Sequence, residues 1–489
     1  MTPAEPRRVP IAGKVGFGVG QLAEGLHSAG INGFLILYYQ QVLGLPGTLA
    51  GTALLIAMIF DAFSDPMVGA FSDHVRTRFG RRHPFIVASA IPLGVVFFAL
   101  FSPPAGLDQT GLFAWLVTFA VLERVALTFY GVPHSALGAE MAPQYDDRST
   151  IFSVSTGFGF LGGVLGLSCA YIFFFPETPE FRPGTLNPAG YPLLASVFAL
   201  GMVLSIFACA WGTRSEIPYL VGRTDHPTSF DLTQTFRNVG VIVSNRSFAA
   251  LFLGSVFGAL VLNIDEILNP YMGLHFWALP TDQIAVLPFA ALLGLPVALF
   301  LAQYLPRVFD KRNTTMLCIV VFVIFANTPV FLRLLDVSWF PENGSRWIVP
   351  ILFGRGVLVG CFAPVALIML ASMLADVCDE IELESGQRLE GLVFSARSFA
   401  LKLTSGVGNW IGGVILDLIA FPTNATVGTV PEDVLFNLGL VVGPLGAGLG
   451  SVGLGFYMMY RLDRGRHAEI SAELAERRSA REPESALAS

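Results

Sequence analysis

The sequence predicts an all-α membrane protein in which twelve transmembrane helices form two six-helix lobes. Three observations predict this class. Hydrophobic residues make up 53% of the 489 positions, and charged residues make up only 13%. Apolar runs of ~20 residues or more, the length that crosses a bilayer, recur along the whole chain. Since soluble chains carry about 25% charged residues, the composition speaks against an ordinary soluble protein.

Turn signals between the apolar runs define the twelve spans, whose ends are set only to within several residues. The first span starts after Lys14, runs past Tyr39 and has no small-residue cleavage site, so it is not expected to be a removable signal peptide. Several spans exceed the ~20 residues that a crossing needs, which predicts tilted or projecting helices. In order, the spans are 15–43, 49–74, 83–103, 111–141, 149–175, 191–213, 247–274, 281–305, 314–335, 346–376, 390–420 and 434–461.

Basic residues gather in alternate loops, and this pattern sets the predicted orientation. By the positive-inside rule these loops and both chain ends face the cytoplasm, which agrees with an even number of spans. We therefore expect a multi-pass protein of the plasma (inner) membrane. The opposite loops hold little beyond Arg182 and Arg346. The cytoplasmic set is Arg7, Arg8, Lys14, Arg76, Arg78, Arg81, Arg82, Arg148, Arg214, Arg223, Arg237, Arg246, Arg307, Lys311, Arg312, Arg388 and the Arg-rich tail.

The longest polar stretch between spans, 214–246, lies in the middle of the chain. It is predicted to be a cytoplasmic linker between an N-terminal lobe, 1–213, and a C-terminal lobe, 247–461. A short helix near 231–237 is expected to lie on the membrane surface. The tail, 462–489, is charged, and we expect it to be disordered beyond a first helical stretch.

A weak internal repeat supports the two lobes. The loop after the second span reads Arg76-Thr-Arg-Phe-Gly-Arg-Arg82, and the loop after the eighth reads Arg307-Val-Phe-Asp-Lys-Arg312. Basic loops at corresponding places in two halves are what a parallel repeat predicts. The similarity is slight and does not establish the fold by itself.

Two acidic residues, Asp61 and Asp65, lie inside one of the most apolar stretches of the chain. An Asp at the centre of a membrane helix costs roughly 2.5–3.5 kcal/mol on insertion scales. The spacing of four places both on one helix face, one turn apart, where like charges need a cation, a proton or a basic partner. The pair predicts either a cation or proton site in a transporter or a structural salt bridge to another helix.

The segment Gly69-Ala-Phe-Ser-Asp73, followed by Arg78-Phe-Gly-Arg-Arg82, resembles the signature loop between helices 2 and 3 of the major facilitator superfamily. Gly69 permits a close helix contact. Asp73 at a helix end can pair with Arg81 or Arg82 and lock the cytoplasmic helix ends together in the outward-facing state. These four residues form a predicted cytoplasmic gate; the alternative is an ordinary positive-inside loop.

A narrower resemblance covers nearly the whole chain. Several separated segments, in order, are similar to those of the glycoside–pentoside–hexuronide:cation symporters, a family that includes the melibiose permease. The resemblance implies the major facilitator fold and cation-coupled transport. The matching segments are Lys14-Val-Gly-Phe-Gly-Val-Gly20, Phe60-Asp-Ala-Phe-Ser-Asp-Pro-Met-Val-Gly69, Gly131-Val-Pro-His-Ser-Ala-Leu137, and Gly386-Gln-Arg-Leu-Glu-Gly-Leu-Val-Phe-Ser395 leading to Lys402.

In that family two helix-2 acids contribute to the Na⁺ or H⁺ site, and a helix-11 lysine lies near the cation and the substrate. The resemblance implies these roles for Asp61, Asp65 and Lys402, with Na⁺ or H⁺ as the coupling ion. Na⁺ prefers oxygen ligands, and the Lys402 ammonium can neutralise the pair when no ion is bound. Taken alone, Lys402 is also compatible with a side chain that reaches the membrane interface.

Gly25 and Gly131 depart from the family pattern, because they stand where the sugar permeases carry acids on helices 1 and 4. Without those acids the chain lacks the usual contacts to sugar hydroxyls, so a simple disaccharide is not expected, and H⁺ coupling stays open. Glu24 is adjacent to Gly25 but offset by about 100° around the helix. It is expected to substitute only if the helix is rotated.

Other polar residues in the spans each have two interpretations. Arg124 lies seven residues before Gly131 on the same face of the fourth span. It either holds an anionic group by a bidentate contact or pairs with an acid of a neighbouring helix. His134 and His27 are either proton relays or hydrogen-bonded residues at helix–helix contacts, and Glu123 is expected to be structural.

Together these observations predict a cation-coupled symporter that works by alternating access, with no cofactor and no nucleic-acid partner. The substrate is expected to be a glycoside, a uronide or a related small molecule. A lysophospholipid is the alternative, because the resemblance extends to the eukaryotic lysophosphatidylcholine symporter. An intramembrane enzyme or a transporter-like sensor is a remote alternative, since the spans contain no nucleophile motif and the five cysteines lack metal-ligand spacing. The bilayer is the other partner, and a monomer is expected.

Overall fold

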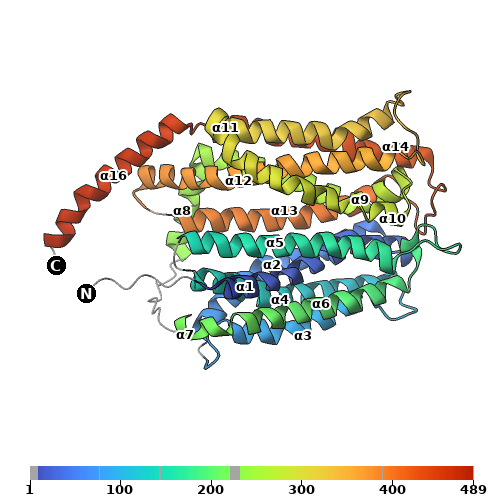
Figure 1. Ribbon diagram of the computed structural model, residues 1–489, viewed down its shortest axis with the longest axis horizontal. Coiled ribbons are helices and arrows are strands. Elements are labelled where there is room, and N and C mark those ends of the chain that lie inside the picture. Colours follow the sequence, from blue (N-terminus) through green and yellow to red (C-terminus); the bar gives the residue numbers. More distant parts are fainter. Residues whose placement is uncertain (1–8, 76, 143–144, 221–231, 388, 488–489) are drawn as a thin grey trace. The chain divides into compact units, whose positions relative to one another are not determined.

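The computed structural model describes residues 9–75, 77–142, 145–220, 232–387 and 389–487, and every regular element within them is helical (Figure 1). The long helices are α1 (Ile11–Gly30), α2 (Gly47–His74), α3 (His83–Leu100), α4 (Gln109–Met141), α5 (Tyr145–Cys169), α6 (Gly190–Gly212), α9 (Arg246–Tyr271), α11 (Pro288–Leu334), α12 (Ile348–Ser385), α13 (Glu390–Leu418) and α16 (Arg464–Leu487). Shorter helices are α7 (Ile217–Leu220), α8 (Leu232–Ser244), α10 (Thr281–Ile284), α14 (Glu432–Leu440) and α15 (Gly446–Met458).

Ten helical segments in the described part of the chain are long and apolar enough to cross a membrane. Two differences separate this set from the predicted spans. The helix α1, which contains polar side chains such as Gln21 and Glu24, is not among the ten. One segment, 281–334, covers both predicted spans 281–305 and 314–335.

The helix α11 is interrupted inside this double segment. At Asp310 the backbone has φ 68° and ψ 160°, which are not helical values. The predicted spans 281–305 and 314–335 lie on either side of this break. The sequence analysis expected a loop between them, whereas the connecting residues stay helical up to the kink.

Several helices continue into one-turn π-helical segments, which are common at functional or strained places. Such turns follow α1, α5 and α9 and precede α15. They are Ile31–Leu35, Tyr38–Val42, Ala170–Phe174, Met272–Phe276 and Val441–Leu445.

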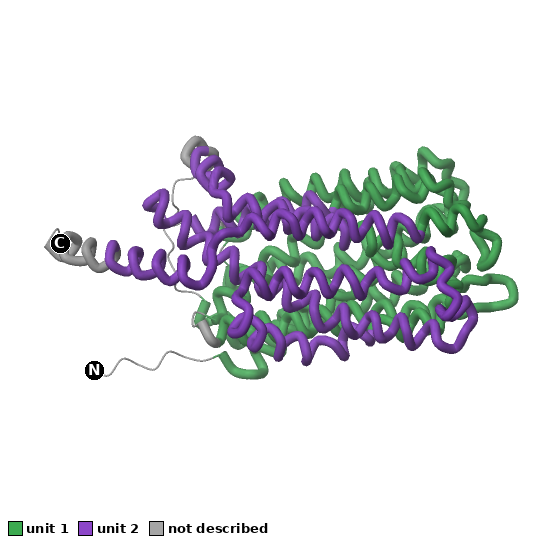
Figure 2. The backbone as a smooth tube through the Cα atoms, turned by 90° about the horizontal axis from the view of Figure 1, so that it is seen from above, with its two compact units in different colours: residues 1–226, 263–288, 406–438 green, residues 227–262, 289–405, 439–489 purple. Residues whose placement is uncertain are grey.

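The chain divides into two compact units, whose segments Figure 2 colours separately. Unit 1 comprises residues 1–226, 263–288 and 406–438, and unit 2 comprises 227–262, 289–405 and 439–489. Boundaries between the units fall within α9, α13 and α14 and at the first residue of α11.

In unit 1, α1 packs against α5 and α6, α2 packs against α4, and α3 packs against α4 and α6. Small residues make these contacts close. A Cβ added to Gly16 of α1 would lie 2.8 Å from Cα of Gly212 in α6, so only glycine permits this approach. The result is a tightly packed framework around α1.

The start of α2 is held by the end of α13, which belongs to the same unit. The Asp417 carboxylate accepts hydrogen bonds from the backbone N–H of Gly47 at 2.8 Å and of Thr48 at 2.7 Å. A carboxylate at a helix N-terminus satisfies unpaired N–H groups and interacts favourably with the helix dipole. Gly413 allows the approach, since a Cβ there would lie 2.1 Å from the Gly47 carbonyl oxygen.

In unit 2, the C-terminal part of α12 forms a hydrophobic cluster with α16. Ile470 and Leu474 of α16 are buried, as are Val377 and Ile381 of α12. The helix α16 spans Arg464–Leu487, whereas the sequence analysis expected disorder beyond a first helical stretch. Alanine, glutamate and arginine favour helix, and ion pairs between neighbouring turns add support.

These ion pairs join Arg466 to Glu469 at 2.9 Å and Glu473 to Arg477 at 2.8 Å. The hydrogen bond to Glu469 raises the pKa of the exposed Arg466 side chain. The pair therefore stays charged and adds a favourable contact between neighbouring turns of the helix.

Candidate functional site

The two acids predicted as a cation site both lie on α2. Asp61 is buried, with 4% of its surface exposed, and Asp65 is half-buried one turn further on. The Asp61 carboxylate accepts a hydrogen bond from the Thr128 hydroxyl of α4 at 3.0 Å. Pro66 follows directly and cannot donate to the carbonyl of Ala62. The site thus combines two carboxylates with a locally weakened helix backbone.

Thr128 links this acid to its surroundings on α4. Its hydroxyl oxygen lies 3.2 Å from the Ser64 hydroxyl and 3.0 Å from the Arg124 carbonyl oxygen. A hydroxyl carries a single proton, so Thr128 can donate to Asp61 or to the carbonyl but not fully to both. The number of donors that reach Asp61 can therefore change with the charge of the carboxylate.

Arg124 pairs with an acid of its own helix rather than of a neighbouring one. Its Nε atom lies 3.6 Å from Oε2 of Glu123, and Oε1 of the same carboxylate lies 2.5 Å from Nε2 of His27 on α1. Glu123 is 2% exposed. The cluster places a buried acid between two basic side chains, and it brings His27 to a helix–helix contact, one of the two interpretations that the sequence analysis gave.

His134 lies at the contact of α4 with α1. Its ring stacks on Phe17 with centroids 4.2 Å apart, and Nε2 lies 3.0 Å from the Phe17 carbonyl oxygen. A carbonyl can only accept, so the ring donates from Nε2. This is the hydrogen-bonded helix–helix contact that the sequence analysis gave as one of two interpretations.

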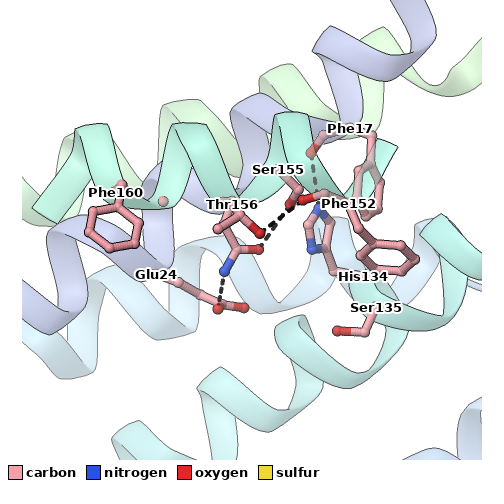
Figure 3. Close-up of a pocket in the computed structure, with 10 residues that line it drawn as sticks. Phe17, Glu24, His134, Ser135, Phe152, Ser155, Thr156 and Phe160 are labelled. Carbon is pink, nitrogen blue, oxygen red and sulfur yellow. Dashed lines mark hydrogen bonds between the residues drawn. The ribbon is translucent and has the colours of Figure 1, made fainter. Parts of the chain in front are cut away.

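A pocket of about 380 Å³ opens between α1, α4 and α5 in unit 1 (Figure 3). This volume is at the lower end of the range of roughly 300–1,000 Å³ typical of small-molecule sites. Polar and aromatic side chains both contribute. The lining residues are Phe17, Gln21, Glu24, His134, Ser135, Phe152, Ser155, Thr156, Gly159 and Phe160.

Glu24, rather than Gly25, faces this pocket. A Cβ on Gly25 would lie 2.3 Å from the Gly159 carbonyl oxygen of α5, so Gly25 is a packing position between helices. A Cβ on Gly131 would lie 3.4 Å from Oε1 of Glu24. The Glu24 carboxylate therefore reaches the space beside Gly131, although the sequence analysis expected this only for a rotated helix.

The four predicted gate residues lie at the C-terminal end of α2 and in the segment that follows it. Arg82 donates to Asp73 at 2.5 Å, to Ser72 at 2.6 Å and to Glu140 at 2.9 Å. Arg81 donates to the same Glu140 oxygen at 2.7 Å. Gly69 faces Val132 of α4, where a Cβ would make an ordinary contact at 3.7 Å.

Glu140 was missed by the sequence analysis. It lies at the end of α4, opposite the arginine-rich loop that precedes α3. The available signal was an acid at the end of a span in a chain that also contains an arginine-rich loop. The network therefore ties α2, the loop and α4 together within unit 1.

Unit 2 contains a comparable ion pair at the corresponding loop. Lys311, directly after the kink in α11, donates to both carboxylate oxygens of Asp376 on α12 at 2.8 and 2.7 Å. The ring of His467, from α16, lies 3.5 Å from Asp376 and 3.1 Å from Asp379. In each half, a basic residue that follows one long helical stretch binds an acid near the end of a later helix: Arg82 binds Glu140 on α4, and Lys311 binds Asp376 on α12. This correspondence supports the internal repeat.

Lys402 is half-buried on α13 and belongs to unit 2, whereas Asp61 and Asp65 belong to unit 1. Within unit 1 the structure brings Asp61 to Thr128, and it brings Glu24 and His134 to a second place, the pocket wall, with Gly131 beside Glu24. The role of Lys402 beside Asp61 and Asp65 stays a prediction.

Comparison with known proteins agrees with this architecture. The chain is 22% identical to the isoprimeverose transporter of Lactiplantibacillus pentosus, over 96% of this chain and 93% of that protein. It is 25% identical to the sodium-dependent lysophosphatidylcholine symporter 1 of Gallus gallus, over 96% and 90% of the two chains. Its fold is similar to that of a mutant of the nucleoside transporter NupG, with a TM-score of 0.62, 13% identity, and 92% and 100% of the chains covered.

The relatives match over nearly their whole length and are transporters by name. The model of one family matches residues 16–464, which includes α2 with its acids, the gate network and the pocket. The chain belongs to the MFS/sugar transport protein family.

Proposed function

We propose that the protein is a cation-coupled secondary symporter that works by alternating access. The observation that carries this proposal is the buried carboxylate of Asp61 on a membrane-spanning helix, because an intramembrane acid is costly and is usually functional. The names of the relatives support symport. The function requires that the ion and the substrate raise each other's affinity, which linkage makes reciprocal.

The proposal includes a twelve-span topology with both ends in the cytoplasm. The break at Asp310 separates α11 into two stretches, and α1 with its π-helical continuation supplies one more span. The lobes are then 1–213 and 247–461, joined by 214–246 and followed by the tail 462–489. A monomer is sufficient for this mechanism.

The coupling ion, Na⁺ or H⁺, is proposed to bind at Asp61 and Asp65. Two carboxylates, the hydroxyls of Ser64 and Thr128 and backbone carbonyls near Pro66 provide the hard oxygen ligands that Na⁺ requires. A proton would serve equally to remove one of two like charges. Lys402 is proposed to approach this site when the ion leaves.

The substrate is proposed to be a glycoside or a related small molecule, in line with the isoprimeverose transporter. The alternative, a lysophospholipid, is favoured by the similarity to the sodium-dependent lysophosphatidylcholine symporter 1. Arg124 gives little support to a uronide, because Glu123 already lies 3.6 Å from its guanidinium.

The test uses purified protein in vesicles, with a sodium gradient, a proton gradient or neither, and radiolabelled glycosides and lysophosphatidylcholine as probes. We expect uphill accumulation with one gradient. Asp61→Asn or Asp65→Asn should abolish this accumulation and leave the thermal unfolding profile close to that of the parent. Unchanged ion dependence in both variants would contradict the assigned site, and signalling without flux would favour a sensor.

A further inference from the structure

The charged side chains that line the pocket in unit 1 are of one sign only. Of the ten residues that line it in the described chain, Glu24 is the one acid, and none is a lysine or an arginine. The other polar groups are the amide of Gln21, the ring of His134 and three hydroxyls, from Ser135, Ser155 and Thr156. The wall therefore offers many neutral hydrogen-bonding groups and one negative charge.

The Glu24 carboxylate is held in place by a short chain of hydrogen bonds. The Ser155 hydroxyl of α5 donates to the side-chain oxygen Oε1 of Gln21 at 3.3 Å, and the side-chain nitrogen Nε2 of Gln21 donates to Oε2 of Glu24. Gly159 makes room for this arrangement, because a Cβ there would lie 2.9 Å from Cγ of Gln21. Gln21 is thus a positioning residue that leaves Oε1 of Glu24 directed toward Gly131.

Figure 3 shows Glu24 beneath Ser155 and Thr156, with His134 and Ser135 on the far side of the pocket. Aromatic rings close the remaining sides, where Phe17 and Phe152 meet edge to face with centroids 6.0 Å apart. A carboxylate among hydroxyls beside aromatic faces binds groups that donate hydrogen bonds and tolerate an apolar surface.

We propose that this pocket holds the polar end of the transported substrate and that Glu24 excludes ligands carrying a negative charge there. The inference rests on the proposed function and adds the charge class of the substrate. Sugar hydroxyls and a substrate ammonium group share the required chemistry, since both are attracted to a carboxylate. A uronide places a second carboxylate beside Glu24 and is disfavoured.

The transport arm uses three nitrophenyl glycosides that differ in one group: a glucoside, its amino-sugar analogue and its glucuronide. Each competes with uptake of a radiolabelled glycoside in vesicles, and lysophosphatidylcholine, with its choline group, is the lipid arm. We expect the glucuronide to compete roughly 10-fold less well than the glucoside. Glu24→Gln should remove this difference, whereas equal competition in the parent protein would overturn the proposal.

The second arm needs no transport, so it separates this inference from the proposed function. A Thr156→Cys variant is labelled with cationic trimethylammonioethyl methanethiosulfonate and with anionic sulfonatoethyl methanethiosulfonate. Rates are normalised to each reagent's reaction with a free thiol and corrected for the parent protein. We expect the normalised labelling rate to be roughly 10-fold higher for the cationic reagent than for the anionic one. Glu24→Gln should make the two rates equal.

Two matched controls define the result. Ser153→Cys places a thiol on the same helix outside the pocket lining, and its reagent preference should not respond to Glu24→Gln. Glu177→Gln removes an exposed loop acid and should leave the Thr156→Cys preference unchanged. A failure of ion-driven uptake would remove the proposed function, while an unbiased or anion-favouring pocket would remove this inference alone.

Discussion

At the residue scale, Gly25 and its neighbour Glu24 have different surroundings on α1. Gly25 stands where similar sugar permeases carry an acid. In this structure it packs against the α5 backbone. Its neighbour Glu24 lines the pocket. The reason is geometric, since adjacent residues on a helix point about 100° apart, and only one of them can face the cavity while the other faces α5.

Gly25→Ala should destabilise the protein, because the added methyl would lie 2.3 Å from the Gly159 carbonyl oxygen and 2.7 Å from the Gly163 nitrogen. Backbone atoms cannot move aside cheaply, so we expect a loss of about 1–3 kcal/mol. The matched control is Gly157→Ala on α5, where a Cβ meets nothing within 4 Å and helix propensity predicts a gain of up to ~1 kcal/mol. Unfolding of both variants in detergent micelles measures the difference, and equal stabilities would contradict the α1–α5 contact.

At the element scale, short basic loops are fastened to the ends of long helices. Glu140 on α4 accepts from both Arg81 and Arg82, and Asp376 on α12 accepts from Lys311. These contacts join elements within one unit. They fix the segment after α2, next to the predicted gate residue Asp73, and the segment beside the kink in α11.

Glu140→Gln should weaken the predicted gate network, because Arg82 is 6% exposed and would lose one charged acceptor, with Asp73 remaining as the other. Leaving such a group short of partners costs about 1–3 kcal/mol. The stability lost through Glu140→Gln should be smaller in a protein that already carries Arg82→Gln than in the parent protein, because the effects of contacting residues are not additive. Unfolding midpoints of the two single variants and the double variant measure the coupling between Glu140 and Arg82, with Glu177→Gln as the control. Strictly additive losses of stability would show that the two residues are not coupled.

At the scale of the whole molecule, the start of α2 and the end of α13 are joined inside unit 1 although more than three hundred positions separate them, Gly47 against Asp417. The proposed alternating access would require helices to separate at one side of the membrane and then at the other. The Asp417 cap and the Gly47–Gly413 contact are therefore expected to open and re-form in each transport cycle.

A disulfide between Thr48→Cys and Asp417→Cys should stop transport reversibly. The Asp417 carboxylate lies 2.7 Å from the backbone nitrogen of Thr48, which brings the two side-chain positions near the range a disulfide needs. We expect oxidation to abolish uptake and dithiothreitol to restore it, with each single variant insensitive to oxidant. Normal uptake by the fully cross-linked protein would contradict the proposed opening at this side.

Much of this architecture follows from the sequence alone. Apolar run lengths determine where helices cross the bilayer, because an unsatisfied backbone is too costly in lipid for other structures. The acids at positions 61 and 65 are visible because charge in such runs is expensive. The gate loop is visible because its glycine, acid and arginines have fixed spacings.

Only the tertiary structure decided what each polar side chain meets. It assigned Arg124 to Glu123, joined Thr128 to Asp61, brought Glu140 to the arginines and turned Glu24 toward Gly131. It also kept the connection in α11 helical up to Asp310 and ordered α16 against α12. Local patterns set helix formation and membrane insertion, whereas partners across helices depend on rotation and packing, which no single helix determines by itself.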